Sequence, residues 1–143
     1  MTDEPTSRPL PVPDAVSAPF WQAAACHELT MAQCGNCSTF SYPPDPVCLA
    51  CGSFEPGWQF VPVSGKGRIL SWTVVRQALI PGVADLLPYV TVDVELDEQP
   101  GLRMVARLLD GMDVPLALDD RVEACFEDLA PGVAVPAFRL ADE

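Results

Sequence analysis

The residues best suited to chemistry in this sequence are two closely spaced cysteine pairs, Cys34-Gly-Asn-Cys37 and Cys48-Leu-Ala-Cys51. A CxxC pair forms a tight knuckle that presents two thiolates to one metal ion, and two pairs complete a tetrahedral site with zinc–sulfur bonds of about 2.3 Å. Gly35 and Gly52 suit such knuckles, because glycine lets the backbone reverse without a Cβ. The spacing predicts a zinc ribbon over residues 29–53 that binds one zinc ion. Two disulfides, or an iron site of the rubredoxin type, are the alternatives.

A site filled by four cysteines leaves no position for water or substrate, whereas catalytic zinc keeps one position open. We therefore interpret the zinc as structural, which argues against a stand-alone zinc enzyme. The one histidine, His27, has no visible nucleophile or acid partner and is interpreted as an ordinary residue at a helix end. The sequence predicts no catalytic residue.

The composition restricts the class of partner and the compartment. Twenty Asp and Glu against eight Lys and Arg give a formal net charge of −12, which should repel polyanions such as nucleic acids. Six cysteines without a leading apolar signal segment indicate a reducing, cytoplasmic setting. No run approaches the ~18 apolar residues of a membrane span, so no membrane association is expected.

The order of these sequence patterns along the chain predicts three segments. Residues 1–28 form a proline-rich arm and a short helix over 20–27, which Ser17 caps and Pro19 opens. Residues 29–56 form the zinc ribbon, and residues 57–143 form a β-rich domain. The arm is either a floppy terminus or a strap that lies over a partner.

Five strands are predicted after the ribbon, beginning with a long run over 59–76 that Ser64-Gly-Lys-Gly67 interrupts. Residues 89–97 alternate strictly between apolar and polar, and 102–108 continue that pattern after a turn. Strands over 121–127 and 135–140 complete the set, with no helix long enough for a parallel crossover. The count and length predict a mostly β fold in which a closed, antiparallel, five-stranded OB barrel follows the ribbon.

The carboxylates of the first hairpin are expected to form ion pairs rather than to act as acids or bases. Arg103 and Arg107 point outward from 102–108, and Asp93 and Glu95 point outward from 89–97. We expect the two arginines to meet the two acids across the hairpin, each pair contributing a fraction of a kcal/mol.

Ligands of OB folds usually contact the loops between strands 1 and 2 and between strands 4 and 5, here 77–88 and 128–135. Both loops lack lysine, arginine and aromatic residues, so the predicted face is apolar and suits a protein surface or an acyl chain. The predicted partner-binding residues are two aromatics of the helix and four apolar residues of the first loop: Phe20, Trp21, Leu79, Ile80, Leu86 and Leu87. Lys66 and Arg68, a close pair of cations, are candidates for contacting a CoA phosphate or for local ion pairs.

The chain resembles a family of small proteins in which a rubredoxin-like zinc ribbon precedes an OB-fold domain and which associate with thiolase-like enzymes. The resemblance runs from about Phe20 to Leu140. It rests on the Phe20-Trp21 opening, the ribbon from Cys34 to Gly52 with its Tyr-Pro-Pro, Ser64-Gly-Lys-Gly67, Ser71-Trp-Thr-Val-Val75, the strand from Pro88 to Asp97, and Pro136-Ala-Phe138. Asp119-Asp120 departs from the family, which usually has Ile-Gly before the fourth strand.

The resemblance implies a non-catalytic subunit of a hetero-oligomer that processes acyl-CoA. Relatives bind thiolases, acyltransferases of that superfamily, lipid-transfer-protein-type retro-aldolases or acyl-CoA hydratases, in some cases in steroid side-chain degradation. They stabilise the partner enzyme and help to form its CoA-ester site, so a CoA ester is expected at the interface. The alternative is a nucleic-acid-binding protein, because ribbons and OB barrels both serve that role, although the charge and the loop composition oppose it.

Overall fold

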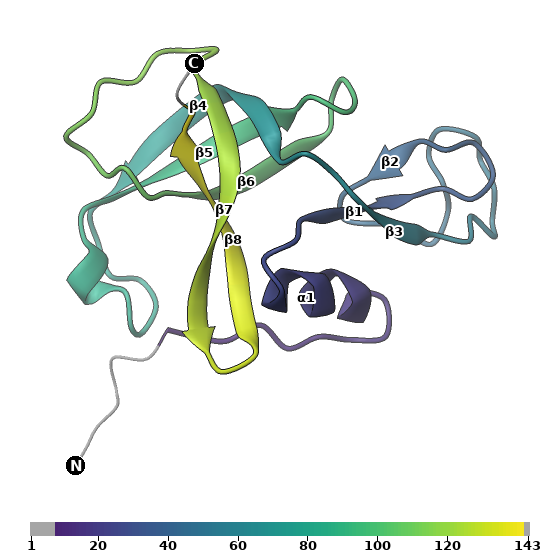
Figure 1. Ribbon diagram of the computed structural model, residues 1–143, viewed down its shortest axis with the longest axis horizontal. Helices are drawn as coiled ribbons and strands as arrows, with labels where there is room; N and C mark the ends of the chain where they lie inside the picture. Colours follow the sequence, from purple (N-terminus) through teal and green to yellow (C-terminus); the bar gives the residue numbers. More distant parts are fainter. Residues whose placement is uncertain (1–7, 142–143) are drawn as a thin grey trace.

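The computed structural model describes residues 8–141 and confirms a mostly β fold with one short α-helix. Figure 1 shows a small sheet on one side, a barrel on the other, and helix α1 (Ala18–Ala25) between them. The first seven residues of the predicted arm lie outside the described part of the chain. No helix of the described residues is long and apolar enough to cross a membrane.

Helix α1 begins differently from the prediction. Ser17 occupies the N-cap position, but its hydroxyl makes no capping hydrogen bond to the helix. Instead the Ser17 hydroxyl accepts a bond from the Asp14 N–H (3.1 Å), and the Asp14 carboxylate accepts one from the Ser17 N–H (2.7 Å). This reciprocal pair forms a turn that leads into the helix, and the bond from the Ser17 N–H lowers the pKa of Asp14.

The end of α1 is a Schellman motif built around His27. The Glu28 N–H donates to the Ala23 carbonyl (3.0 Å) and the His27 N–H donates to the Ala24 carbonyl (2.8 Å). His27 itself has a φ of 61°, the left-handed conformation that this motif needs and that glycine usually supplies. The histidine is therefore a helix-end residue, as the sequence indicated, but it has an acid partner that the sequence did not reveal, Asp128.

The ribbon contains a three-stranded antiparallel sheet in the order β2-β1-β3. Its strands are β1 (Thr30–Gln33), β2 (Phe40–Ser41) and β3 (Gln59–Pro62). The long strand expected over 59–76 is in fact two strands, because the chain breaks at Val63–Gly65 and Gly65 takes a φ of 76°. Its first part pairs with β1 in the ribbon sheet and only its second part enters the barrel.

The five-stranded OB barrel is confirmed. Its strands are β4 (Lys66–Val75), β5 (Tyr89–Leu96), β6 (Arg103–Leu108), β7 (Arg121–Ala130) and β8 (Val133–Leu140), closed in the order β4-β5-β6-β8-β7. All pairings are antiparallel except β6 with β8, which run parallel. A short 3-10 helix, η1 (Ala84–Leu86), lies in the β4–β5 loop.

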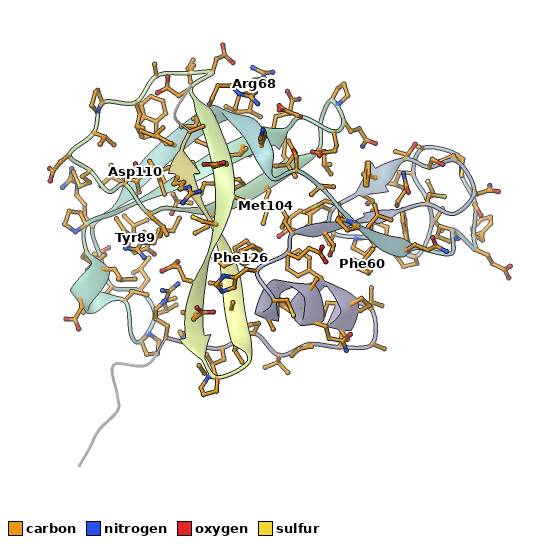
Figure 2. All side chains as sticks on the ribbon, in the orientation of Figure 1. Phe60, Arg68, Tyr89, Met104, Asp110 and Phe126 are labelled. Atoms are coloured by element: carbon orange, nitrogen blue, oxygen red, sulfur yellow. The ribbon has the colours of Figure 1, made fainter. Side chains whose placement is uncertain are left out.

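The core follows the alternation read from the sequence. Along β5 every second residue is buried, and Val92 and Val94 are fully enclosed. Met104, labelled in Figure 2, faces them from β6. Phe20 of α1 and Met31 of β1 join the same cluster, so helix, ribbon sheet and barrel share one buried apolar core. The division into the segments 1–28, 29–56 and 57–143 stays a prediction.

The expected ion pairs across the β5–β6 hairpin are only partly correct. Arg103 pairs with Asp93, but Arg107 pairs with Glu127 of β7, and Glu95 is bonded by Arg68 of β4. The register explains the difference, because it places Arg107 opposite Thr91, which offers no charge. When the barrel closes, Glu127 of β7 and Arg68 of β4 come next to the β5–β6 hairpin and supply the other partners.

Candidate functional site

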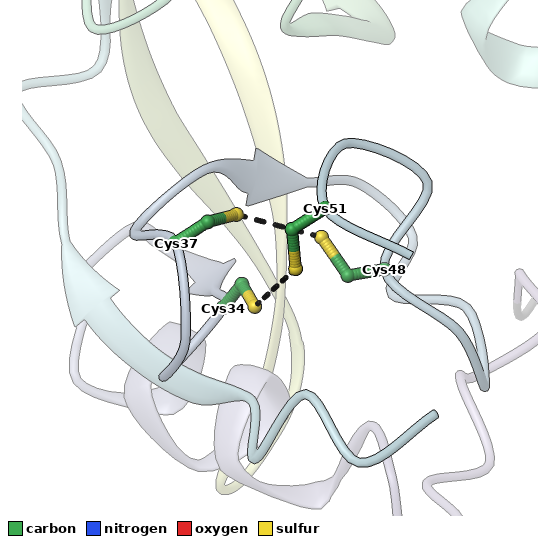
Figure 3. Close-up of side chains that lie close together, drawn as sticks. All are labelled: Cys34, Cys37, Cys48 and Cys51. Atoms are coloured by element: carbon green, nitrogen blue, oxygen red, sulfur yellow. Dashed lines mark hydrogen bonds between the residues drawn. The ribbon is translucent and has the colours of Figure 1, made fainter. Parts of the chain in front are cut away.

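The four cysteines of the two CxxC pairs form the metal-ligand cluster of the described residues, with their sulfur atoms within 4.8 Å of one another. Figure 3 shows them converging from two loops, with Cys34 Sγ 4.0 Å from Cys51 Sγ and Cys37 Sγ 3.6 Å from Cys48 Sγ. Four sulfurs at about 2.3 Å from a central zinc are roughly 3.8 Å apart, so the cluster fits a tetrahedral zinc ion. None of the six cysteines is in a disulfide, which removes that alternative.

Local backbone bonds shape the two knuckles. The Ser38 N–H donates to the Cys34 carbonyl (2.9 Å) and the Gly52 N–H donates to the Cys48 carbonyl (2.7 Å), so each CxxC segment closes into a turn. Gly52 takes a φ of 78°, which a side chain would disfavour. The Asn36 N–H donates to Cys34 Sγ (3.3 Å). Such N–H···S bonds stabilise a thiolate and keep its lone pairs directed at a metal.

The thiols also differ in environment. Cys34 and Cys48 are buried, whereas Cys51 is exposed. Hydrogen bonds from the Thr39 side chain and backbone lower the pKa of Cys37 to about 6. Cys37 can therefore bind a metal as a thiolate near neutral pH, whereas Cys48, whose pKa is raised to about 11, must lose its proton when the metal binds.

The structure places the two predicted partner-binding aromatics beside the ribbon. Phe20 is only 7% exposed and packs edge-on against Trp21, with ring centroids 4.9 Å apart, so its main role is in the core. Trp21 lines a groove of about 260 Å³ together with Tyr42 and Phe60. Phe60, labelled in Figure 2, lies between α1 and the ribbon sheet.

The other four predicted contact residues lie in the β4–β5 loop, on the barrel. Leu79 is 79% exposed and Ile80 is 49% exposed, whereas Leu86 and Leu87 are half-buried. The sequence prediction therefore corresponds to two separate surfaces.

The two cations proposed for a CoA phosphate lie on β4. The Arg68 guanidinium is already bonded to Glu95 (2.8 Å and 3.1 Å) and to Asp119. These carboxylates raise the pKa of Arg68 further, and Lys66 is exposed nearby on the same strand. Figure 2 shows Arg68 at the end of the barrel away from Phe126.

A pocket lies between the β4–β5 loop and the β7–β8 hairpin, where the OB topology predicts one, on the outer face of β5 and β6. Most of 128–135, which was expected to be a loop, belongs to the paired ends of β7 and β8. From the two segments alone, this face was expected to carry no cation. The structure adds Arg8 from the N-terminal arm, Arg107 from β6 and the aromatic Tyr89 from β5. The outward position of Arg107 was readable from the alternation of β6, but no local pattern indicated that Arg8 reaches the barrel.

The chain matches two protein-family models and is similar to a solved structure. Residues 21–57 match the family model "ChsH2, rubredoxin-like zinc ribbon domain", and residues 60–127 match "ChsH2, C-terminal OB-fold domain". A solved structure described as "Ltp2-ChsH2(DUF35) aldolase" has a chain with 29% sequence identity and a TM-score of 0.77. The similarity covers 91% of this chain and 98% of that one.

Two curated relatives carry different names. A "Probable enoyl-CoA hydratase alpha subunit" of Thermomonospora curvata is 32% identical over 134 residues, and a "DUF35 domain-containing scaffold protein" of Pyrococcus furiosus is 38% identical over 60 residues. The matches cover 94% and 41% of this chain, but only 40% and 41% of the relatives, so the aligned part spans about two fifths of their length. With both family models matched in order and the fold in agreement, the chain belongs to the ChsH2-type family, in which a rubredoxin-like zinc ribbon precedes an OB-fold domain.

Proposed function

We propose that this protein is a non-catalytic accessory subunit that binds and stabilises a thiolase-superfamily enzyme and helps to form its CoA-ester site. The partner is a thiolase, an acyltransferase or a lipid-transfer-protein-type retro-aldolase, and steroid side-chain degradation is one candidate setting. The observation that carries the proposal is the similarity to almost the whole of a chain described as part of an "Ltp2-ChsH2(DUF35) aldolase". The name "scaffold protein" of the Pyrococcus furiosus relative supports the same role.

The ionisable groups of the described residues agree with a role that involves no chemistry. Six of the seven arginines from Arg8 to Arg139 are bonded to carboxylates, and the His27 side chain is paired with Asp128. The arginines stay protonated and so cannot act as bases. A histidine oriented by a carboxylate is, however, the usual arrangement of a general base, so His27→Ala is the variant that tests this part of the proposal. We infer that the partner supplies the nucleophile or base, while this chain holds partner loops in a productive geometry.

The zinc belongs to this proposal as a structural element. Cys34, Cys37, Cys48 and Cys51 would hold it, and their four thiolates would leave no position for a substrate. Its contribution is to fix the two ribbon loops, which have few apolar residues of their own.

The test is co-expression with a thiolase-superfamily enzyme of the same organism, followed by affinity purification with a tag on one chain only. We expect a stable complex of defined mass. Leu79→Asp should weaken it at least tenfold, because Leu79 is among the most exposed apolar side chains. Leu118→Asp, at a leucine that is 63% exposed on the β6–β7 loop, is the matched control and should not weaken the complex. Failure of any such enzyme to co-purify contradicts the proposal.

A second candidate partner is an acyl-CoA hydratase. It is favoured by the Thermomonospora curvata relative, which is similar over 94% of this chain and is named as a hydratase subunit. Assays of the purified complex separate the two candidates. Carbon–carbon cleavage of a β-hydroxyacyl-CoA indicates the aldolase partner, and reversible hydration of an enoyl-CoA indicates the hydratase.

A role of Lys66 and Arg68 in binding a CoA phosphate stays a prediction. Arg68 would first have to leave Glu95 and Asp119, which reduces the free energy available for a new contact. Alanine at both positions should raise the KM of the complex for its CoA ester without changing kcat if the contact forms.

A further inference from the structure

We propose that the outer face of β5 and β6 carries a binding pocket for an amphipathic carboxylate, a small molecule with one carboxylate group and a short aliphatic chain. The pocket has a volume of about 310 Å³, which is enough for a small ligand. This inference goes beyond the accessory role, because it needs neither the partner enzyme nor the zinc site.

The walls of the pocket are mainly apolar. Ile80, Val83 and Leu86 reach over it from the β4–β5 loop, and Leu129 and Val135 approach from the β7–β8 end. The N-terminal arm passes the tip of the β7–β8 hairpin in Figure 1, and its residues Arg8 and Pro9 complete the rim. An aliphatic chain in this space would be removed from water on several sides.

The polar part of the pocket has a surplus of positive charge. Arg8 Nη1 lies 2.8 Å from Glu127 Oε1, and Arg107 Nη1 lies 2.6 Å from the same oxygen. Among the ion pairs of residues 8–141, Glu127 is the one carboxylate shared by two arginines. Two guanidinium groups and one carboxylate leave about one positive charge uncompensated, in a protein with a net charge of −12.

One hydrogen-bond donor in this group has no acceptor. Arg107 Nε is buried and makes no hydrogen bond, although Nη1 of the same side chain is bonded to Glu127. A buried donor without an acceptor is costly and usually indicates a missing water or ligand. A ligand would reach this donor only after the Arg107 side chain turned its Nε edge toward the pocket, and a guanidinium group in that orientation binds a carboxylate through two parallel N–H···O bonds.

The hydroxyl groups nearby support a single carboxylate head group. Thr91 lies directly opposite Arg107 across the hairpin, and Tyr89 follows on the same face of β5 (Figure 2). A phosphate with two negative charges would exceed the one uncompensated positive charge. A nucleic acid would need a longer cationic track and more stacking rings than the one tyrosine of this pocket.

The test is isothermal titration calorimetry of the isolated, zinc-loaded full chain with octanoate as the probe. We expect saturable binding of one octanoate per chain. Octanol, which lacks the charge, and acetate, which lacks the chain, should each bind at least tenfold more weakly. Equal binding of octanol and octanoate, or no binding of octanoate at millimolar concentration, overturns the proposal.

Three variants assign the binding to the pocket. Arg107→Gln should weaken octanoate binding at least tenfold, whereas Arg103→Gln, on the same strand but paired with Asp93, should change it less than twofold. Glu127→Gln should tighten binding at least threefold, because it removes the carboxylate that competes for both arginines. A gain in affinity cannot result from poor folding, so this variant remains decisive even if Arg107→Gln unfolds. Unchanged binding in Arg107→Gln that is folded by circular dichroism, or weaker binding in Glu127→Gln, contradicts the proposal.

Discussion

His27 Nε2 lies 2.8 Å from Asp128 Oδ1, and this contact ties the end of helix α1 to strand β7. The imidazole also stacks on Phe126, with ring centroids 5.3 Å apart and planes 13° from parallel. The helix is therefore fixed to the barrel through its last turn as well as through Phe20 in the core. Because both side chains are largely exposed, this contact itself contributes less than about 1 kcal/mol.

We predict that His27→Gly is more stable than His27→Ala. Both variants lose the stack on Phe126 and the hydrogen bond to Asp128, but the φ of 61° at this position destabilises an alanine variant by about 1 kcal/mol and leaves a glycine variant unaffected. Urea unfolding followed by circular dichroism measures the difference. Equal stability of the two variants, or a more stable alanine variant, would show that the Schellman motif is not maintained.

A second prediction concerns Gly67, which lies in β4 where it crosses β5. A Cβ at this position would be 2.5 Å from the Glu95 carbonyl oxygen and 2.6 Å from Val94 Cγ1, so Gly67→Ala should destabilise the protein by about 3 kcal/mol. Gly101→Ala is the matched control, because a Cβ there meets nothing within 4 Å and only the φ of 81° opposes it, at about 1 kcal/mol. Denaturant midpoints of the two variants test the order, and a Gly67→Ala variant no less stable than Gly101→Ala contradicts it.

Most of the correct predictions about the fold and the metal site rested on local sequence patterns. The paired spacing of the cysteines was sufficient to place four sulfurs together, and the strict alternation of 89–97 identified both the strand and its buried face. The contacts that form when the barrel closes could not be predicted from the sequence, because they join segments that are far apart along the chain. Arg107 was predicted to pair with an acid of the neighbouring strand, but it pairs with Glu127 of β7. Arg8, which is 119 positions away from Glu127 in the sequence, pairs with the same acid. The sequence likewise showed an interruption at 64–67, but it did not show that the two parts of 59–76 belong to different sheets.

Metal binding should depend on each cysteine of the cluster. In Cys48→Ser we expect the zinc content to fall from about one per chain to roughly a tenth of that, with increased proteolysis within 29–53, because metal binding and local folding are coupled. Elemental analysis and limited chymotrypsin digestion, which can cleave after Phe40, measure both effects. Cys26→Ser, at an exposed cysteine outside the cluster, is the control and should keep its zinc. A Cys48→Ser protein that is metal-free yet unchanged in digestion would contradict the structural role.

The stability of the barrel should depend on pH through Glu95. The Gly101 N–H and the Arg68 guanidinium hold the pKa of Glu95 below its ordinary value of 4.5. A carboxyl group with a depressed folded-state pKa contributes stability above its unfolded-state pKa, and the contribution is lost as the pH falls through the folded-state value. The difference in unfolding free energy between wild type and Glu95→Gln should therefore shrink between about pH 5 and about pH 3.

The control for this pH dependence is Glu55→Gln. Glu55 is exposed and belongs to no ion pair among residues 8–141, yet its substitution removes the same single negative charge. Effects of the overall charge of −12 are thus common to both variants. A difference for Glu95→Gln that grows as the solution becomes more acidic would mean that the Glu95 contacts do not stabilise its ionised form.

The two cysteines outside the cluster should differ in reactivity. Cys26 is exposed at the end of α1, whereas Cys125 is partly covered in β7 and its burial raises the pKa of its thiol. Because the thiolate is the reactive form, we expect a maleimide at pH 7 to modify Cys26 roughly tenfold faster than Cys125, and both before the zinc-bound thiolates. Mass spectrometry of timed, unreduced samples follows the order, and Cys26→Ser should remove the fast phase. Faster modification of Cys125 than of Cys26 would contradict the difference in their exposure. Protection of both thiols until a reductant is added would show that they are not free.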